Sequence, residues 1–215
     1  ALAMAVLCLG NCSVFAESPQ KIPFEIDRSK VILSVRINDS RPLRIILDSG
    51  MPGRGILLFK KELGEELNLR SAEIYRIRGA GRGSRSSVMR VASQNLSIGD
   101  VGFSNQAVMV LQSDTMSGFS TDGVMGNSIF GPHAVRFDFE DKIITLMESG
   151  SFRPDSSWEF LDMTFNDHGI PFIKAAVSVS GENEIPLQVY IDSASGEALE
   201  LLVRPGQRFI LPEDL

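Results

Sequence analysis

The sequence predicts a mainly β protein in which one structural unit begins a second time. Short runs of aliphatic and β-branched residues alternate with turns rich in Gly, Asn, Asp and Ser, and long helical periodicities are absent. Within this pattern, residues 42–49 recur as residues 186–193, an offset of 144 residues. Each copy is a short apolar strand that leads an Asp and then a Ser into a turn of small residues.

The two repeated acidic residues, Asp48 and Asp192, are the first candidates for chemistry. A carboxylate at the end of a buried strand is costly unless it is paired or used. Two such strands in one chain therefore indicate a site assembled from two half-sites, with one carboxylate from each. Because two carboxylates a few Å apart cannot both ionise, we expect a pair that shares a proton.

Composition and charge restrict the function. The chain has 215 residues, of which 43% are hydrophobic and 22% charged, as in a soluble globular protein with a core of one large or two small domains. A net charge of −6 argues against nucleic acid or an anionic membrane as a partner. His133 and His168 stand alone without ligand spacing, so we expect neither a metal site nor a cofactor.

Residues 1–16 resemble a secretory signal peptide. The run is apolar and uncharged, ends in Ala16, and is too short to span a bilayer comfortably. We therefore expect a secreted or periplasmic mature chain without an integral membrane span. Cys8 and Cys12 both lie within this segment, so the mature chain would contain no disulfide. A lipid anchor on Cys12 is the weaker alternative, because Asn11 is the wrong size for the residue before a lipid-attachment cysteine.

The elements of the first half follow in order. Residues 31–37 and 43–47 predict two strands joined by a turn at residues 38–42, and residues 59–69 predict a short surface helix. Residues 76–90, rich in Arg and Gly, predict a hairpin with solvated arginines, because no phosphate-loop spacing fits them. Further strands are expected at residues 88–98, 106–111 and 134–147.

Three stretches resemble one protein family. Leu47-Asp48-Ser49-Gly50 resembles the Asp-Thr/Ser-Gly signature of pepsin-like and retropepsin-like aspartic proteases. Residues 122–126 resemble the apolar-apolar-Gly strand that follows it in the family, and residues 130–146 resemble the closing hairpin of bacterial retropepsin-like domains. The resemblance implies an acid-protease-type β-barrel lobe over residues 17–150. The start of a second similar lobe would follow at residues 151–215, after a polar linker.

The resemblance implies a role for each residue of the two turns. Asp48 and Asp192 would be the catalytic pair, which holds a water, ionises one carboxyl as general base and keeps a proton on the other. Ser49 and Ser193 would be supporting residues whose hydroxyls bond across the turns. Gly50 would direct its amide at the carboxylates.

Two further expectations come from the same resemblance. Gly79, Gly81 and Gly83 occupy the position of a flap that would close over an extended peptide or protein substrate. The implied function is an aspartic endopeptidase without a metal ion. Asp122, which precedes Gly123, is expected to be a turn residue.

The second half departs from the family pattern and leaves alternatives open. Ala194 stands where the family has Gly, and its methyl group is costly if the backbone there needs a positive φ. A second apolar-apolar-Gly strand is not found after Asp192, so the second lobe is expected to be incomplete. The chain could then be a non-catalytic peptide-binding module on the same scaffold. It could also form a homodimer that uses Asp48 from two chains.

Overall fold

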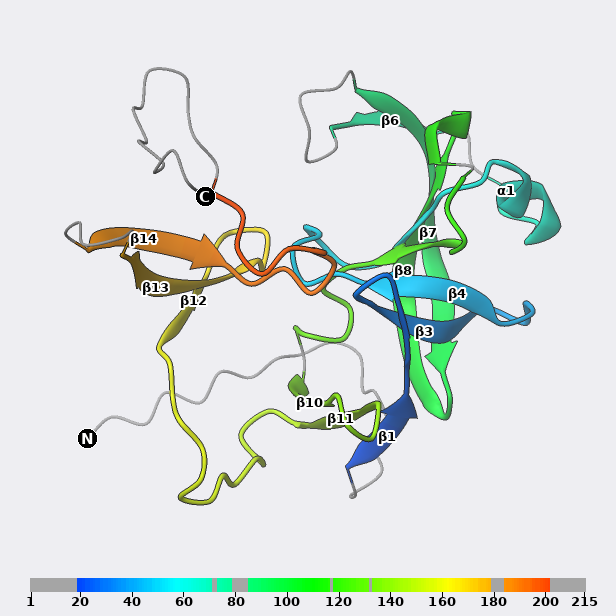
Figure 1. Cartoon of the computed structure of the whole chain (residues 1–215). Helices are drawn as coiled ribbons and strands as arrows, with labels where there is room; N and C mark the ends of the chain where they lie inside the picture. The colour runs from blue at the N-terminus through cyan, green and yellow to red at the C-terminus, as the bar shows by residue number, and fades with distance from the viewer. Residues whose placement is uncertain are drawn as a thin grey trace, which may run out of the picture.

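The computed structural model describes residues 19–70, 73–78, 85–116, 118–131, 133–178 and 184–201. It confirms the predicted fold class, a mainly β protein with a closed barrel followed by the start of a second β unit (Figure 1). The predicted signal segment, with Cys8 and Cys12, lies outside the described residues, as do Gly79, Gly81 and Gly83. No helix within the described ranges is long and apolar enough to cross a membrane.

A ring of hydrogen-bonded strands forms the barrel. Its order is β3-β4-β9-β5-β8-β7, and pairing of β7 with β3, with Val35 opposite Ile98, closes it. Closure leaves these strands without a free edge. The six strands are β3 (Lys30–Ile37), β4 (Leu43–Leu47), β5 (Ile56–Leu58), β7 (Ser86–Ile98), β8 (Val101–Leu111) and β9 (Gly123–Met125). Strands β2 (Glu25–Asp27) and β6 (Ile74–Ile77) extend the sheet beyond the ring.

Strand β4, which leads to Asp48, is buried on both of its faces. Leu43, Ile45 and Leu47 point into the main core and are fully buried, as the period of two in a strand requires. Ile46 points the other way and joins a second apolar cluster with Ile32 and Phe59. The carboxyl end of this strand is therefore held rigidly by packing.

The predicted helix is shorter than expected. Helix α1 spans Glu62–Glu66, whereas the sequence pattern ran over residues 59–69. Leu63 is buried, as the pattern predicted. Asn68 takes a positive φ of 51°, a left-handed conformation that ends helices, and the amide of Leu69 bonds back to the carbonyl of Gly64. A single-turn 3₁₀ helix spans Asp114–Met116.

A second sheet of three strands lies below the barrel in Figure 1. It pairs β1 (Gln20–Pro23) with β11 (Ile143–Glu148), and β11 with β10 (His133–Asp138). The two predicted arms of residues 134–147 thus form an antiparallel hairpin. His133 precedes the strand expected from residue 134 but is the first residue of β10, where its Nδ1 lies 2.9 Å from the carbonyl oxygen of Ile129.

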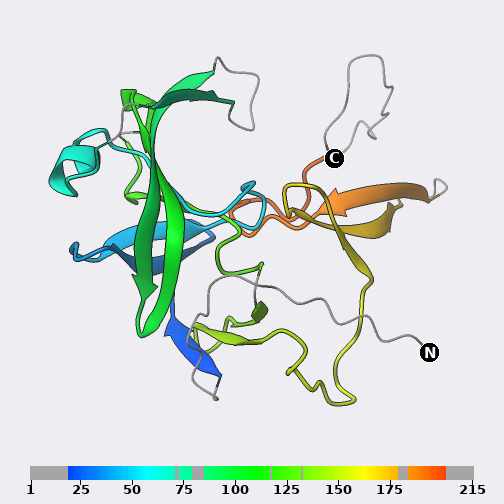
Figure 2. The same cartoon turned by 180° about the vertical axis from the view of Figure 1, so that it is seen from behind.

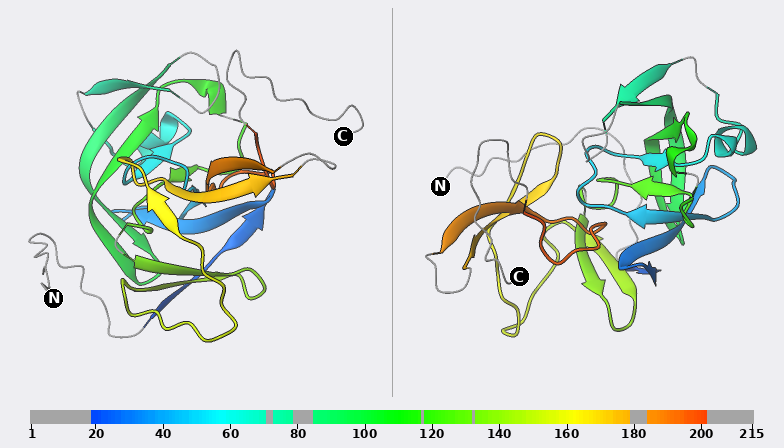
Figure 3. Two further views of the ribbon diagram at one scale, coloured as in Figure 1. Left: turned by 90° about the vertical axis from the view of Figure 1, so that its left-hand side faces the viewer. Right: turned by 45° about the horizontal axis from the view of Figure 1, so that its top comes forward.

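The third sheet repeats the start of the barrel. Strands β12 (Met163–Phe165), β13 (Pro171–Val177) and β14 (Ile185–Tyr190) pair in the same antiparallel order as β2, β3 and β4. In both sheets, the residue two before the repeated Asp is paired with the middle strand. Ile46 of β4 pairs with Ile32 of β3, and Tyr190 of β14 pairs with Phe172 of β13. Figures 2 and 3 show this sheet beside the barrel, with the two Asp turns between them.

Gly123 provides a test of how tightly β9 is packed. A Cβ atom at this residue would lie 2.5 Å from the carbonyl oxygen of Leu57, so we expect Gly123→Ala to lower the free energy of unfolding by about 1–3 kcal/mol. Gly102→Ala is the matched control, since a Cβ there meets nothing within 4 Å. Denaturant unfolding measures both variants, and equal stabilities would contradict the close approach of β9 and β5.

Candidate active site

The site lies where the ends of β4 and β14 meet between the barrel and the third sheet (Figure 1). Each strand leads into a four-residue turn, closed by a bond from the amide of Met51 to the carbonyl of Asp48 and from the amide of Ser195 to that of Asp192. We call residues 48–51 the first turn and residues 192–195 the second turn. The repeat seen in the sequence is therefore also a repeat in three dimensions.

Strand β9 passes directly behind the first turn. It runs parallel to β4, and the amide of Asp48 donates to the carbonyl oxygen of Met125 over 2.9 Å. A Cβ atom at Gly126 would lie 2.8 Å from the carbonyl oxygens of both Met51 and Gly53. Only glycine permits this approach, as the apolar-apolar-Gly pattern predicted.

Reciprocal hydrogen bonds through two serine hydroxyls join the turns. Ser49 Oγ donates to the carbonyl oxygen of Ile191 over 2.7 Å and accepts from the amide of Ser193 over 3.0 Å. Ser193 Oγ donates to the carbonyl oxygen of Leu47 over 2.9 Å and accepts from the amide of Ser49 over 2.9 Å. Both hydroxyls thus use a donor and an acceptor position, which fixes the two turns against each other in one register.

The two carboxyl groups converge on Gly50. The amide of Gly50 donates to Asp48 Oδ1 over 2.7 Å, and the amide of Ala194 donates to Asp192 Oδ1 over 2.9 Å. A Cβ atom at Gly50 would lie 3.2 Å from Asp48 Oδ1 and 3.1 Å from Asp192 Cγ. A side chain at this residue would therefore push the carboxyls apart.

The surroundings of Asp48 change its acidity. The pKa of this carboxyl is raised from 3.8 to about 6, chiefly by burial and then by the negative charge of Asp192 and a hydrogen bond with it. Bonds from the amides of Gly50 and Met51 oppose the rise in pKa. The pair therefore retains a proton at mildly acidic pH, which allows one carboxyl to donate while the other accepts.

Ala194 fits the second turn without strain. Among the described residues, the non-glycine residues with a positive φ do not include Ala194, so its methyl group meets no conformational penalty. The side chain packs against the apolar cluster of Ile32, Ile46 and Phe59. Its carbonyl oxygen accepts a hydrogen bond of 2.6 Å from Lys30 Nζ, a contact that the sequence pattern did not indicate.

Asp122 does more than the predicted turn capping. Its carboxylate accepts the backbone amide of Arg44 over 2.9 Å and lies 3.6 Å from Arg41 Nη1 and 3.8 Å from Lys60 Nζ. It thereby ties the loop before β9 to β4. The Asp-Gly dipeptide gave the only local signal, and the partners lie too far away along the sequence to be inferred from it.

The structure brings five of the predicted site residues together. They are Asp48, Ser49, Gly50, Asp192 and Ser193. The predicted flap glycines lie outside the described residues. The catalytic roles of these residues stay predictions.

The comparison with protein families agrees with the sequence resemblance. Residues 33–131 match the family model described as aspartyl protease. The crystal structure of a retropepsin-like aspartic protease from Rickettsia conorii is similar, with 17% sequence identity, a TM-score of 0.42, and coverage of 60% of this chain and 91% of that chain. No curated protein sequence matches the chain. The family match spans β4, the first turn, β9 and Gly126.

The serine bonds can be tested by removing one hydroxyl. Ser193→Ala leaves the amide of Ser49 and the carbonyl of Leu47 without this partner, so we expect the free energy of unfolding to fall by about 1–3 kcal/mol. Ser195→Ala is the control, because among the described residues its hydroxyl bonds to Glu197 of the same loop and not to the barrel. Chemical denaturation of both variants gives the comparison, and a Ser193→Ala protein as stable as the control would argue against the bonds.

The pKa of Asp48 predicts how stability varies with pH. Because this pKa rises from 3.8 to about 6 on folding, the folded state binds more protons than the unfolded state between these values, and the free energy of unfolding falls as pH rises through that window. We expect Asp48→Asn to gain stability relative to wild type from pH 4 to pH 7. The exposed Asp39→Asn is the control. Unfolding curves with the same pH dependence in wild type and Asp48→Asn would contradict the assignment.

Proposed function

We propose that the protein is an aspartic endopeptidase whose water is activated between Asp48 and Asp192, a proposal supported by the match of residues 33–131 to the aspartyl protease family model. The family match indicates a protease. The observation that carries the finer proposal is the convergence of the two carboxyls on Gly50, with the turns joined by reciprocal serine bonds.

The mechanism follows from a pair of carboxyls that shares one proton. The ionised carboxyl takes a proton from the water while the oxygen of that water attacks the scissile carbonyl carbon. The protonated carboxyl donates its proton to the carbonyl oxygen. The resulting tetrahedral diol collapses when the first carboxyl passes the proton it took from the water to the amide nitrogen and the second carboxyl takes a proton back from a diol hydroxyl, so that the C–N bond breaks and a carboxylic acid and an amine are released. The raised pKa of Asp48 supports its holding the proton at mildly acidic pH.

The fixed geometry of the turns supports this mechanism. Amides of Gly50 and Ala194 already point at one oxygen of each carboxyl, so these dipoles need no reorganisation during the reaction. The serine bonds hold both carboxyls in one orientation toward a common water. Neither the attack of the water nor the collapse of the diol requires a covalent bond between the protein and the substrate.

Substrate binding is proposed along the face of the turns. Strands β6 and β7 pair from Ile74 opposite Met89 to Ile77 opposite Ser86, and this hairpin extends from the barrel toward the side of the third sheet (Figures 1 and 2). Its position supports the proposal of a flap over an extended peptide. The apolar residues 1–16 support a secreted or periplasmic location as part of the same proposal.

The proposal places both carboxyls in one chain. Asp192 occupies the position beside Asp48 that a second copy would fill in the homodimer alternative. Sedimentation of the active protein separates the two, since activity restricted to a dimer would favour the alternative. The peptide-binding alternative requires a protein that binds peptides but turns none over at any pH.

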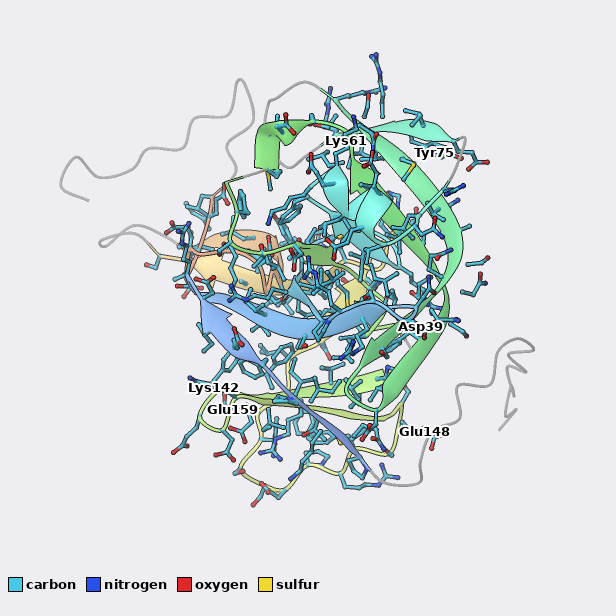
Figure 4. The ribbon with its side chains drawn as sticks, turned by 90° about the vertical axis from the view of Figure 1, so that its right-hand side faces the viewer. Asp39, Lys61, Tyr75, Lys142, Glu148 and Glu159 are labelled. Atoms are coloured by element: carbon cyan, nitrogen blue, oxygen red, sulfur yellow. The ribbon has the colours of Figure 1, made fainter. Side chains whose placement is uncertain are left out.

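Substitution of the aspartates tests the proposed chemistry. Asp48→Asn and Asp192→Asn should each lower kcat/KM for a peptide substrate at pH 5 by at least about 100-fold, because each removes a group that transfers a proton. Asp39→Asn, at the outer edge of the barrel in Figure 4, should retain wild-type activity. Peptide cleavage that survives in Asp48→Asn would rule out the proposed pair.

A further inference from the structure

Lys30 reaches from the barrel to the second turn. It is the first residue of β3, is half-buried, and donates from Nζ to the carbonyl oxygen of Ala194 over 2.6 Å, although 164 residues separate the two. The same Nζ lies 3.9 Å from where a Cβ atom at Gly196 would be. A charged donor from the barrel therefore binds the backbone of the turn that contains Asp192.

The partner of Lys30 is a neutral backbone carbonyl. Within the described part of the chain, the ammonium of Lys30 forms no ion pair. Asp27, its register partner in β2, accepts from Ser120 Oγ over 2.9 Å and lies 3.5 Å from Arg44 Nη2. A hydrogen bond from an ionised donor to a carbonyl is stronger than one between neutral groups, and it fixes the position of the backbone.

The element that presents Lys30 is rigid. Arg28 and Ser29 have φ values of 49° and 63°, so β2 and β3 are joined by a two-residue turn with positive φ at both residues, the kind that matches the twist of a hairpin. Val31 and Leu33, which follow in β3, are buried in the barrel core. The side chain of Lys30 thus extends from a fixed base.

The second turn has fewer anchors than the first. In the first turn, the amide of Asp48 bonds to β9, which lies beside β4. In the described residues of the third sheet, β14 pairs with β13 alone, and its own anchor is the bond from the amide of Ile191 to the carbonyl of Pro171. The position of Asp192 consequently depends on contacts from the barrel.

We propose that Lys30 is a positioning residue that holds the second turn, and with it the carboxyl of Asp192, in register with Asp48; this rests on the proposed function. The amide of Ala194 binds Asp192 Oδ1 while its carbonyl binds Lys30, so this residue is held at both ends. Without Lys30, the second turn loses one of its contacts with the barrel while the serine bonds remain, so the carboxyl of Asp192 is held less precisely relative to Asp48. A displacement of about 1 Å at a reacting group can cost about 100-fold in rate.

Kinetics of Lys30 variants test the proposal. Lys30→Met should lower kcat by roughly 10- to 100-fold with little change in KM, because the substrate still binds while the carboxyl pair is misaligned. Lys30→Arg keeps a charged donor and should restore most of the lost kcat. Lys21→Met, an exposed lysine of β1, is the matched control. A wild-type kcat in Lys30→Met, or no rescue by Lys30→Arg, would overturn the proposal.

Hydrogen exchange supplies a readout that does not need activity. The amides of Ser193 and Ala194 should exchange about tenfold faster in Lys30→Met, while the amide of Asp48 keeps its protection. If wild type cleaves no peptide but this exchange difference appears, the endopeptidase proposal fails and the anchoring by Lys30 stands. If cleavage occurs and exchange in the second turn is unchanged, the anchoring fails alone.

Discussion

The forced proximity of two carboxyl groups is the constraint on which the rest of the site depends. Two unit charges 4 Å apart repel by about 4 kcal/mol at an effective dielectric constant of 20. The four bonds made by Ser49 and Ser193 each contribute about 0.5–1.5 kcal/mol, so their total is of similar size. The bonds can therefore hold the turns together against this repulsion, and burial together with the charge of Asp192 raises the pKa of Asp48, so that the pair keeps one proton at mildly acidic pH.

The two lobes differ in how rigidly they hold their carboxyl groups. Strand β4 is buried on both faces within a closed barrel, whereas β14 has exposed residues such as Ile185 and Tyr190. Rigid packing holds the first carboxyl, and contacts with the barrel hold the second. The pair is assembled by bonds between lobes, so its geometry can change with contacts at the second turn while the barrel stays intact.

The sequence predicted the features that have local signatures. The strand before Asp48 was predicted at its observed bounds, because a strand of buried aliphatic residues ends at a polar turn. The convergence of Asp48 and Asp192 followed from the repeat, which placed equivalent residues at equivalent strand ends. The resemblance of residues 122–126 to the apolar-apolar-Gly strand identified β9, whose last apolar residue is followed by Gly126, where close backbone approach excludes every side chain.

The features that were missed depend on contacts between distant parts of the chain. Nothing near Lys30 indicates that its ammonium binds a carbonyl 164 residues away, and nothing near Asp122 indicates its bond to the amide of Arg44. The strand β5 is only Ile56–Leu58 and is specified by its neighbours β8 and β9. Whether Ala194 is tolerated could not be predicted either, because its φ is set by the turn that it completes.

Contacts between the lobes are reciprocal but chemically different. The loop between β12 and β13 reaches the first turn's neighbours, where the carbonyl of Gly169 accepts from Asn127 Nδ2 over 3.0 Å and that of His168 from the amide of Gly53 over 3.4 Å. Lys30, the first residue of β3, reaches the second turn. The first turn is already held by β9, and the contacts that reach its neighbours are hydrogen bonds between neutral groups. A charged donor contacts the turn that lacks such a strand among the described residues, so the stronger bond is found where the fold itself gives less support.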